Sequence, residues 1–580
     1  MRRMRRRQAW LLRSCLRSCL LSCLLGGTAL AGERHALLIG VADLPAMPRS
    51  SWLAGPTADV NAMHAALLQQ GFADARIQRL ADDAGASEAP TRAAVLARLA
   101  QLEKTLGKDD LLLLYWSGHS VLLPAYPGQA AAPQGRRTRL LTRDSQVSHQ
   151  GRQLDGGIAS SELGRAIDAF AARQTQVVAI FDTCHAAAGT RSGDGLTWRG
   201  LAAPDIGWRP MPGAPAASHD AAAADAPRAR PRFVAFYASE AQQRTPEATA
   251  AAAPGQAAGL FTQAVIAALQ SEPQTYAMWA GAATQQYQSA LRAYQLPRSA
   301  WPSPVYAGAL DAALWQGGAT GAAPLWPVQR DARGWQVPYG LLDGIREGDL
   351  FRHAGTRWRA AAVGWGETRL ALLPGDGGDS AAPGWASRTP APLPASAARH
   401  GGQRLATLLA LPATPGQPLL DARIELTLPG KAPRQLAFTD GDLGVLPAGT
   451  RIGLSVENRG AASIDLGLAH LPLDGPAARI YPALDGDSNR MPPAIGAGIS
   501  RFERSFVVSG PRFGVEWLAL VAAPAANGAP QRRFAILDTL PGLASTRGGA
   551  APSPAAALPQ AGASHADQAQ VARLSWRSVQ

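Results

Sequence analysis

Short apolar runs alternate with helical patterns over residues 33–315, and this alternation strongly limits the folds available to the chain. The runs are of strand length and end at glycine or polar residues, which is typical of buried strands. The expected strands are 35–41, 75–80, 110–116, 176–181 and 233–237. The expected helices are 59–70, a segment capped by Thr91, part of 154–173, and 259–269. The alternation predicts an α/β fold with a parallel sheet covered by helices on both faces.

The pattern changes after about residue 320, where short strand candidates are separated by glycine turns. A chain of 580 residues is too long for a single hydrophobic core, so further domains are expected. We predict a small β-rich module at 320–375, a linker at 376–402 and a β-sandwich at 403–535. The C-terminal stretch 543–580 begins as an Ala-, Pro- and Ser-rich tail and is expected to be disordered.

The first 31 residues have the order of a secretory signal. A basic start is followed by the apolar run Cys19–Leu25 and by the small-residue cleavage site Ala29–Ala31. We therefore expect an exported protein, periplasmic or extracellular, with an uncleaved anchor as the alternative. A lipid anchor on Cys23 is a further alternative, because the residues before it weakly resemble a lipoprotein cleavage site. No other segment has about 18 consecutive apolar residues, so no transmembrane span is expected in the mature protein.

The distribution of cysteines leaves one thiol in the predicted mature chain. Cys15, Cys19 and Cys23 lie in the expected signal, and Cys184 lies far outside it. A lone cysteine in an exported protein cannot form an internal disulfide. Cys184 is therefore either an inert core residue or a reactive group.

Charge and composition argue against two kinds of ligand. The net charge of +13 falls to about +6 without the first 31 residues, and no Lys/Arg cluster with interleaved aromatics occurs. Nucleic-acid binding is therefore not expected. A single cysteine and scattered histidines cannot supply zinc-ligand spacing, so no metal site is expected.

Two of the expected strands end in polar residues that can carry chemistry. The run Leu111–Trp116 leads into Ser-Gly-His-Ser, which contains His119, and the run 176–181 leads into Asp-Thr-Cys-His, which contains Cys184. The carboxyl ends of parallel strands meet at one edge of a sheet, where sites form. A cysteine needs a neighbouring base to become a thiolate at neutral pH. His119 is the better base, because His185 follows Cys184 directly and would point to the opposite face of an extended segment.

These two motifs resemble the paired motifs of the metacaspase and caspase-like cysteine peptidases of clan CD. Further segments resemble the same family in the same order. They are His35–Val41, Leu53–Val60, Ala238–Glu247 and Gly259–Thr262. The resemblance implies a caspase-like, doubly wound, mostly parallel sheet and a cysteine endopeptidase that acts on proteins or peptides. It also implies the bacterial exported type, in which an accessory C-terminal β-domain follows, with a possible partner in the cell envelope.

The resemblance also implies roles for individual residues. His119 would be the general base and Cys184 the nucleophile, with the backbone N–H groups of Ser120 and Cys184 binding the oxyanion. Asp59 and Asp182 would be the acidic S1 residues, which implies cleavage after Arg or Lys. Taken without the family, the structural interpretation of each residue is favoured: Asp59 as a helix N-cap and Asp182 as a turn residue at a strand end.

The chain departs from the family pattern beside the expected dyad. Ser120 replaces a glycine that tolerates positive φ, and Ala186-Ala187 replaces the usual Ser-Gly. The alternative function is therefore a catalytically degenerate caspase-fold scaffold of the cell envelope. A thiol redox protein is a third reading, which the lack of a resolving cysteine disfavours.

Calcium activation, common in the family, is not expected here. The comparable stretch, Ile158–Glu162, has hydroxyls where paired carboxylates would be needed. No cofactor is expected.

A long segment at 190–232 separates two of the expected strands and is rich in Ala, Pro and Gly. It contains Arg191, Arg199, Arg209, Arg228 and Arg230. If the specificity is basic, this loop is a candidate for self-cleavage, and the alternative is a solvated, disordered insertion.

Overall fold

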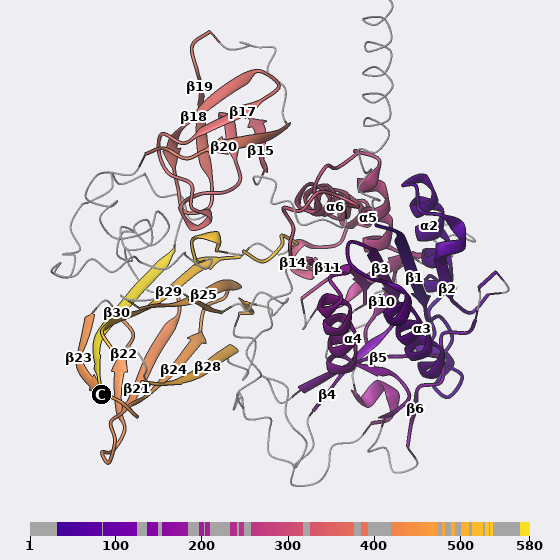
Figure 1. Ribbon diagram of the computed structural model, residues 1–580, viewed down its shortest axis with the longest axis horizontal. Helices are drawn as coiled ribbons and strands as arrows, with labels where there is room; N and C mark the ends of the chain where they lie inside the picture. The colour runs from indigo at the N-terminus through magenta and orange to yellow at the C-terminus, as the bar shows by residue number, and fades with distance from the viewer. Residues whose placement is uncertain are drawn as a thin grey trace, which may run out of the picture.

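Strands β3 and β9 lie at the centre of a mostly parallel sheet in the computed structural model (Figure 1). Every residue of these two strands is buried, which explains their unbroken apolar sequences. Within the described residues the sheet order is β14-β11-β9-β3-β1-β2, with β14 antiparallel to β11. The strands are β1 (Arg34–Gly40), β2 (Ile77–Leu80), β3 (Leu111–Ser117), β9 (Gln176–Asp182), β11 (Phe233–Tyr237) and β14 (Val305–Gly308).

The structure describes 32–83, 85–86, 88–124, 136–148, 154–183, 196–201, 203–208, 232–240, 243–248, 257–316, 325–375, 384–392, 419–439, 441–472, 478–481, 489–493, 500–509, 513–525, 528–532, 534–537 and 569–580. The expected signal at 1–31, the cysteine Cys184 and most of the loop 190–232 lie outside these residues.

Helices cover both faces of the sheet, as the sequence predicts. They are α2 (Pro56–Gln69), α3 (Arg92–Thr105), α4 (Ser160–Ala172), α5 (Leu260–Leu269) and α6 (Tyr276–Ala293). Helices α2, α5 and α6 pack on the face that carries Leu113 and Tyr115, and α3 and α4 pack on the face that carries Leu114 and Trp116. The predicted cap of α3 is confirmed, because the Thr91 hydroxyl accepts from the Ala94 N–H at 3.2 Å.

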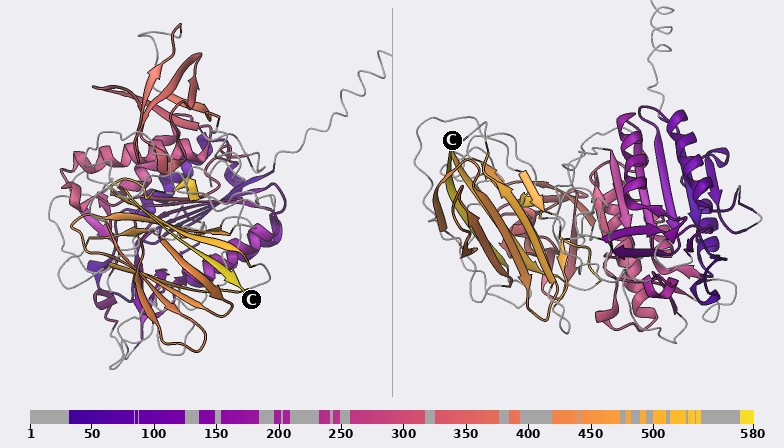
Figure 2. Two further views of the ribbon diagram at one scale, coloured as in Figure 1. Left: turned by 90° about the vertical axis from the view of Figure 1, so that its left-hand side faces the viewer. Right: turned by 90° about the horizontal axis from the view of Figure 1, so that it is seen from below.

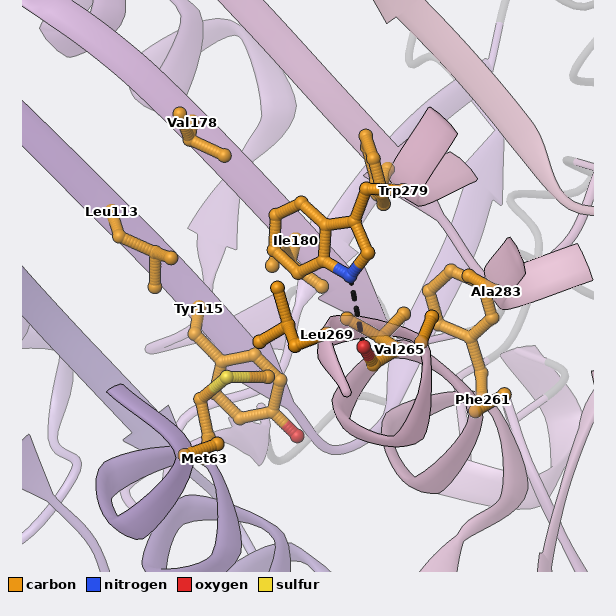
Figure 3. Packing of buried hydrophobic residues seen from close by; sticks show 14 of the residues in the cluster. Met63, Leu113, Tyr115, Val178, Ile180, Phe261, Val265, Leu269, Trp279 and Ala283 are labelled. Atoms are coloured by element: carbon orange, nitrogen blue, oxygen red, sulfur yellow. Dashed lines mark hydrogen bonds between the residues drawn. The ribbon is translucent and has the colours of Figure 1, made fainter. Parts of the chain in front are cut away.

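Trp279 joins α6 to α5 and to the sheet. Its side chain is completely buried and lies over Ile180 and Leu269 (Figure 3). The indole N–H donates to the Val265 carbonyl at 2.9 Å, which satisfies its one polar group. The ring also packs against Phe236, with centroids 4.9 Å apart. This contact fixes α5, whose first residues reach the carboxyl edge of the sheet.

Several smaller strands of the same domain lie outside the central sheet. They are β4 (Ser120–Pro124), β5 (Arg136–Leu140), β6 (Gln146–Val147), β7 (Leu154–Asp155), β8 (Ile158–Ala159), β10 (Leu196–Arg199), β12 (Thr245–Ala248) and β13 (Ala258–Gly259). Strand β12 pairs with β10 on one side and with β13 on the other. Strand β4 continues directly from the end of β3 after a two-residue break.

A closed barrel follows the α/β domain. Its strands are β15 (Leu325–Asp331), β16 (Gly334–Val337), β17 (Leu350–His353), β18 (Thr356–Val363), β19 (Thr368–Leu372) and β20 (Gly384–Thr389). The prediction of a linker over 376–402 was wrong at β20, which closes the barrel between β15 and β17. Only Ala386 of β20 is fully buried, and Trp385 is the one large apolar residue of this strand, so it has no apolar run that would reveal it.

The remaining strands form two facing sheets with a shared apolar core. One sheet contains β21 (Asp421–Thr427), β22 (Arg434–Ala437), β24 (Arg451–Asn458) and β28 (Ser500–Val507). The other contains β23 (Gly441–Pro447), β25 (Ile464–Pro472), β26 (Ala478–Tyr481), β27 (Arg490–Met491), β29 (Val515–Pro524) and β30 (Gln570–Val579). The structure therefore has the expected β-rich C-terminal region.

The disordered tail predicted at 543–580 was wrong for its last residues. Strand β30 pairs with β29 and with β23, so it lies inside the sheet and not at its edge. Its side chains alternate across the sheet, and Leu574 and Trp576 enter the core. The prediction missed this alternation because the Ala- and Pro-rich sequence before it dominates the composition of the stretch 543–580.

The sandwich lies beside the α/β domain (Figure 2), and side chains link the segments after β14 to other parts of the chain. The Gln288 side chain of α6 donates to the Gly528 carbonyl at 2.9 Å, and the Gly528 N–H donates to the Ser303 hydroxyl at 3.1 Å. Arg532 pairs with Asp343 of the barrel at 2.8 Å. Among the described helices, none is long and apolar enough to cross a membrane.

Leu574→Ala should lower the free energy of unfolding of the sandwich by about 2–5 kcal/mol, because it opens a cavity in the core. Arg577→Ala is the matched control on the exposed face of the same strand and should change it by less than about 0.5 kcal/mol. Urea denaturation followed by circular dichroism measures both. Equal and small effects would contradict the placement of β30 in the core.

Candidate active site

The two chemistry-bearing segments leave neighbouring strands at the same edge. Ser117 at the end of β3 lies opposite Asp182 at the end of β9 in the parallel register. His119 follows this point and is 3% exposed, and Thr183 is also buried. Cys184, His185 and Ala186-Ala187 lie outside the described residues, so the pairing of His119 with Cys184 stays a prediction.

The predicted S1 residues Asp59 and Asp182 come together in space from α2 and β9. Both carboxylates are completely buried, and Glu247 of β12 joins them. We call Asp59, Asp182 and Glu247 the carboxylate cluster. Asp59 does not cap its helix, because Gly55 holds the N-cap position of α2. The capping alternative for Asp59 was therefore wrong.

The N-terminus of α5 holds two members of the cluster. The Thr262 N–H and hydroxyl donate to Oδ2 of Asp182 at 3.0 and 2.7 Å. The Gly259 N–H donates to Oδ1 of Asp59 at 2.9 Å. Free N–H groups and the helix dipole favour negative charge at this position. Gly259 must lack a side chain, because a Cβ there would collide with Asp182 and with the Arg199 guanidinium.

The start of α2 holds the third member in the same manner. Oε1 of Glu247 accepts from the N–H groups of Ala54 and Gly55, each at 3.0 Å. Glu247 is thus anchored by the backbone through one oxygen, while its other oxygen faces the cluster. Two helix N-termini therefore stabilise the buried negative charge.

The guanidinium of Arg199 lies between the three carboxylates. This side chain comes from β10 and is completely buried. Its Nη1 lies 2.9 Å from Oδ2 of Asp182, and its Nη2 lies 3.0 Å from Oε2 of Glu247 and also pairs with Asp59. Nη1 donates as well to the main-chain carbonyl of Asp182 at 3.0 Å. The planar guanidinium therefore donates hydrogen bonds to several acceptors that lie along different edges of its plane.

The cluster carries more negative charge than Arg199 supplies positive charge. Burial raises the pKa of Asp59 to about 6, Arg199 opposes this rise, and Asp182 and Glu247 add to it. The pKa of Tyr115 is likewise raised well above its usual value, first by burial and then by Asp59 and Asp182. The site is therefore built for a cation, and the raised pKa of Asp59 favours its uptake of a proton.

His119 touches the residue that follows Arg199. The Gly200 N–H donates to Nδ1 of His119 at 2.9 Å. Since Nδ1 accepts here, the proton of the neutral ring is on Nε2. Burial and then the charge of Arg199 lower the pKa of His119 to about 3, although a hydrogen bond to the backbone of Ser51 acts in the opposite direction. The imidazole is consequently neutral at physiological pH.

Ser120 lies directly beside the same segment. Its carbonyl accepts from the Leu201 N–H at 3.2 Å. Ser120 is not among the described residues with positive φ, so its substitution for glycine causes no strain of that kind. The segment Leu196–Leu201 thus passes from β12, across the carboxylate cluster and His119, to the start of β4.

Sequence reasoning did not identify Glu247 or Arg199 as residues of the site. Glu247 is the last residue of the segment Ala238–Glu247 that resembles the family. Its place in this motif is the signal that could have identified it as a site residue. Arg199 was one of six arginines in the loop 190–232, and nothing in its own residue type separates it from the others. Their roles depend on β12 and β10 pairing at the sheet edge.

Comparison with known proteins places this domain in a family. None of the curated proteins compared with the chain matches it. Among solved structures, the crystal structure of protein GSU0716 from Geobacter sulfurreducens is 18% identical, with a TM-score of 0.33, over 49% of this chain and 98% of that chain. Residues 33–295 match the family model of the caspase domain. This part of the chain is therefore a caspase domain.

Proposed function

We propose that the protein is an exported cysteine endopeptidase that cleaves proteins or peptides after Arg, and less efficiently after Lys. One observation carries this proposal. A buried guanidinium fills the carboxylate cluster while the next backbone nitrogen lies 2.9 Å from His119. A substrate with arginine before the cut bond would present the same groups to the same residues.

The proposed chemistry uses the predicted nucleophile Cys184. His119 takes the thiol proton, and the thiolate attacks the carbonyl carbon before the cut bond. His119 then gives the proton to the departing nitrogen. The contact between Nδ1 of His119 and a backbone nitrogen has the distance that this transfer needs. The N–H groups of Ser120 and Cys184 would bind the oxyanion.

The geometry favours arginine over lysine in this position. The cluster and the Asp182 carbonyl accept hydrogen bonds from different edges of one planar group. A guanidinium has five donors in that plane, whereas an ammonium concentrates three donors at one point. A lysine would therefore leave part of the buried carboxylate charge without a hydrogen bond.

Calcium independence is supported by an ion pair at the stretch Ile158–Glu162. Nη1 of Arg92 donates to Oε2 of Glu162 at 3.1 Å, and the same oxygen accepts from the Ala159 N–H at 3.0 Å. The hydrogen bond from Arg92 lowers the pKa of Glu162 to about 2. A cation of the chain itself thus already neutralises this carboxylate.

Glu247→Gln should lower kcat/KM for Arg-ended reporter peptides by about 10–100-fold, because a charge-assisted hydrogen bond is lost. Both rates are measured in a chain that also carries Arg199→Gln, because Arg199 otherwise competes with the substrate arginine for the carboxylate cluster. Glu88→Gln is the control, because this exposed carboxylate pairs with Arg98 on the surface. Cys184→Ala and His119→Ala should each abolish turnover. No hydrolysis by wild type or by folded Arg199→Gln would contradict the peptidase and favour a scaffold.

Reporter hydrolysis should change by less than about twofold between excess EGTA and millimolar calcium, because Glu162 is already paired. The assay again uses the Arg199→Gln variant. A rise of about tenfold or more on adding calcium would show that Glu162, or another site, takes part in a metal-dependent activation.

Expression from the native start should yield a protein whose first residue is Gly32, because Ala29–Ala31 has the form of a cleavage site. N-terminal sequencing and cell fractionation measure this. A lipid-anchored form would instead remain with membranes and would be released by Cys23→Ala. A protein that retains Met1 in the cytosol would contradict export. Pull-down from an envelope extract then tests whether the sandwich has a partner there.

A further inference from the structure

The segment 528–532 follows β29 and is held by the sandwich on one side and by the α/β domain on the other. We propose that this contact positions the chain between β11 and β12, and with it the Glu247 side of the carboxylate cluster. Ser303 and Gln243 are the positioning residues. The inference rests on the proposed function and gives the C-terminal region a part in substrate selection.

The chain between β11 and β12 leads directly into the carboxylate cluster. We call residues 239–244 the β11–β12 connection, and the structure describes all of it but 241–242. The residue that follows it is Thr245, whose hydroxyl lies 3.5 Å from Oδ1 of Asp182. Glu247 comes two residues later in β12. A shift of the connection would therefore move one carboxylate of the cluster relative to another.

Gln243 fixes the shape of this connection. Its side-chain Oε1 accepts from the Glu240 N–H at 3.2 Å, and its backbone N–H donates to the Glu240 carbonyl at 3.0 Å. The same Oε1 accepts from the Ser303 N–H at 2.7 Å. Truncation of the Gln243 side chain would remove the acceptor of two backbone N–H groups at once, which is costly where those groups are buried.

Ser303 extends the link to the C-terminal region. It is completely buried and lies two residues before β14, the edge strand of the central sheet on the side of the sandwich (Figure 1). Its hydroxyl accepts from the Gly528 N–H at 3.1 Å. Gly528 has φ +77°, and a Cβ there would lie 2.7 Å from the Trp301 ring. Only glycine therefore permits this close approach without strain.

Arg490 holds the segment 528–532 from the side of the sandwich. This side chain is 5% exposed, donates to the Ala529 carbonyl at 3.1 Å and pairs with Asp465 at 2.8 Å. Burial opposes the charge of Arg490, but Asp465 and Glu240 outweigh burial and raise its pKa. Glu240 is completely buried and belongs to the β11–β12 connection. The sandwich thus acts on the connection through a charge as well as through hydrogen bonds.

Attachment of the two domains would by itself account for only part of this arrangement. The hydrogen bond from Gln288 to the Gly528 carbonyl joins the domains and involves no residue of the connection. Ser303 differs, because it accepts from Gly528 and also donates its N–H to Gln243. Attachment alone does not need this second bond. The two bonds of Ser303 therefore join the domain contact to the carboxylate cluster.

Ser303→Ala removes the hydroxyl that accepts from Gly528 and keeps the N–H that donates to Gln243. In a chain that also carries Arg199→Gln, it should raise KM for Arg-ended reporter peptides about three- to tenfold and change kcat by less than about twofold, because the cluster binds ground state and transition state alike. The ratio of kcat/KM for Arg over Lys should also fall, since a displaced Glu247 affects the several hydrogen bonds of a guanidinium more than those of an ammonium. An effect on stability alone would change neither KM nor this ratio.

Gly528→Ala breaks the same link from the other side, in case Ser303→Ala fails to fold, and should give the same changes. Gly430→Ala is the matched control, because Gly430 also lies in the sandwich with positive φ (+71°) but has no atom within 4 Å of an added Cβ. Gln243→Ala should raise KM at least as much, and adding Ser303→Ala to it should raise KM no further, because both act through one path. Thermal melts verify folding of each variant.

Amide hydrogen exchange tests the link without catalysis. The amides of Thr245–Ala248 should exchange at least about threefold faster in Ser303→Ala and Gly528→Ala than in wild type and Gly430→Ala, because β12 is held less firmly. The amides of β1 should exchange at the same rate in all four proteins. Mass spectrometry of peptides from the full chain measures both.

The outcomes separate the two proposals. Unchanged exchange in β12 and unchanged KM in folded Ser303→Ala and Gly528→Ala overturn the positioning role and leave the peptidase intact. Effects on KM that add in the double variant of Gln243 and Ser303 also overturn it, because the two residues then act separately. No hydrolysis by the folded Arg199→Gln chain overturns the peptidase and with it the role in substrate selection, and the exchange rates then decide whether the sandwich positions β12.

Discussion

Burial of carboxylates that face one another is the constraint on which this site depends. Asp59, Asp182 and Glu247 cannot remain charged in a dry environment without donors and a cation. The N-termini of α2 and α5 supply the donors, and Arg199 supplies the cation. The packing of α5 and α6 around Trp279 thus matters for chemistry, because it sets where the α5 amides point.

Much of the α/β domain was predictable, because a fully buried parallel sheet requires continuous apolar strands. Strands β3 and β9 are of this kind, and the expectation of a mostly parallel sheet with helices on both faces is confirmed. Strands β20 and β30 were missed for the opposite reason. Neither has a continuous apolar sequence, each lies beside Ala-, Gly- and Pro-rich sequence, and only pairing with distant strands reveals it.

The site was predictable only where a residue type and a family motif coincide. Asp59 and Asp182 both pair with Arg199, and their role in S1 stays a prediction, whereas the positions of Glu247 and Arg199 depend on a small sheet between segments far apart in the sequence. The low pKa of His119 was also beyond sequence reasoning, since it arises from burial and from Arg199. The position of Cys184 relative to His119 stays a prediction, because Cys184 lies outside the described residues.

The order of strands in the central sheet has a consequence for a nicked chain. The loop 190–232 lies between β9 and β11 in the sequence, yet these two strands are direct neighbours in the sheet. After a cut in this loop, the continuous parallel ladder and two shared apolar cores would still hold the two pieces together. The nicked protein would therefore migrate as one particle in native conditions and as two polypeptides in denaturant, with the barrel and sandwich on the second polypeptide.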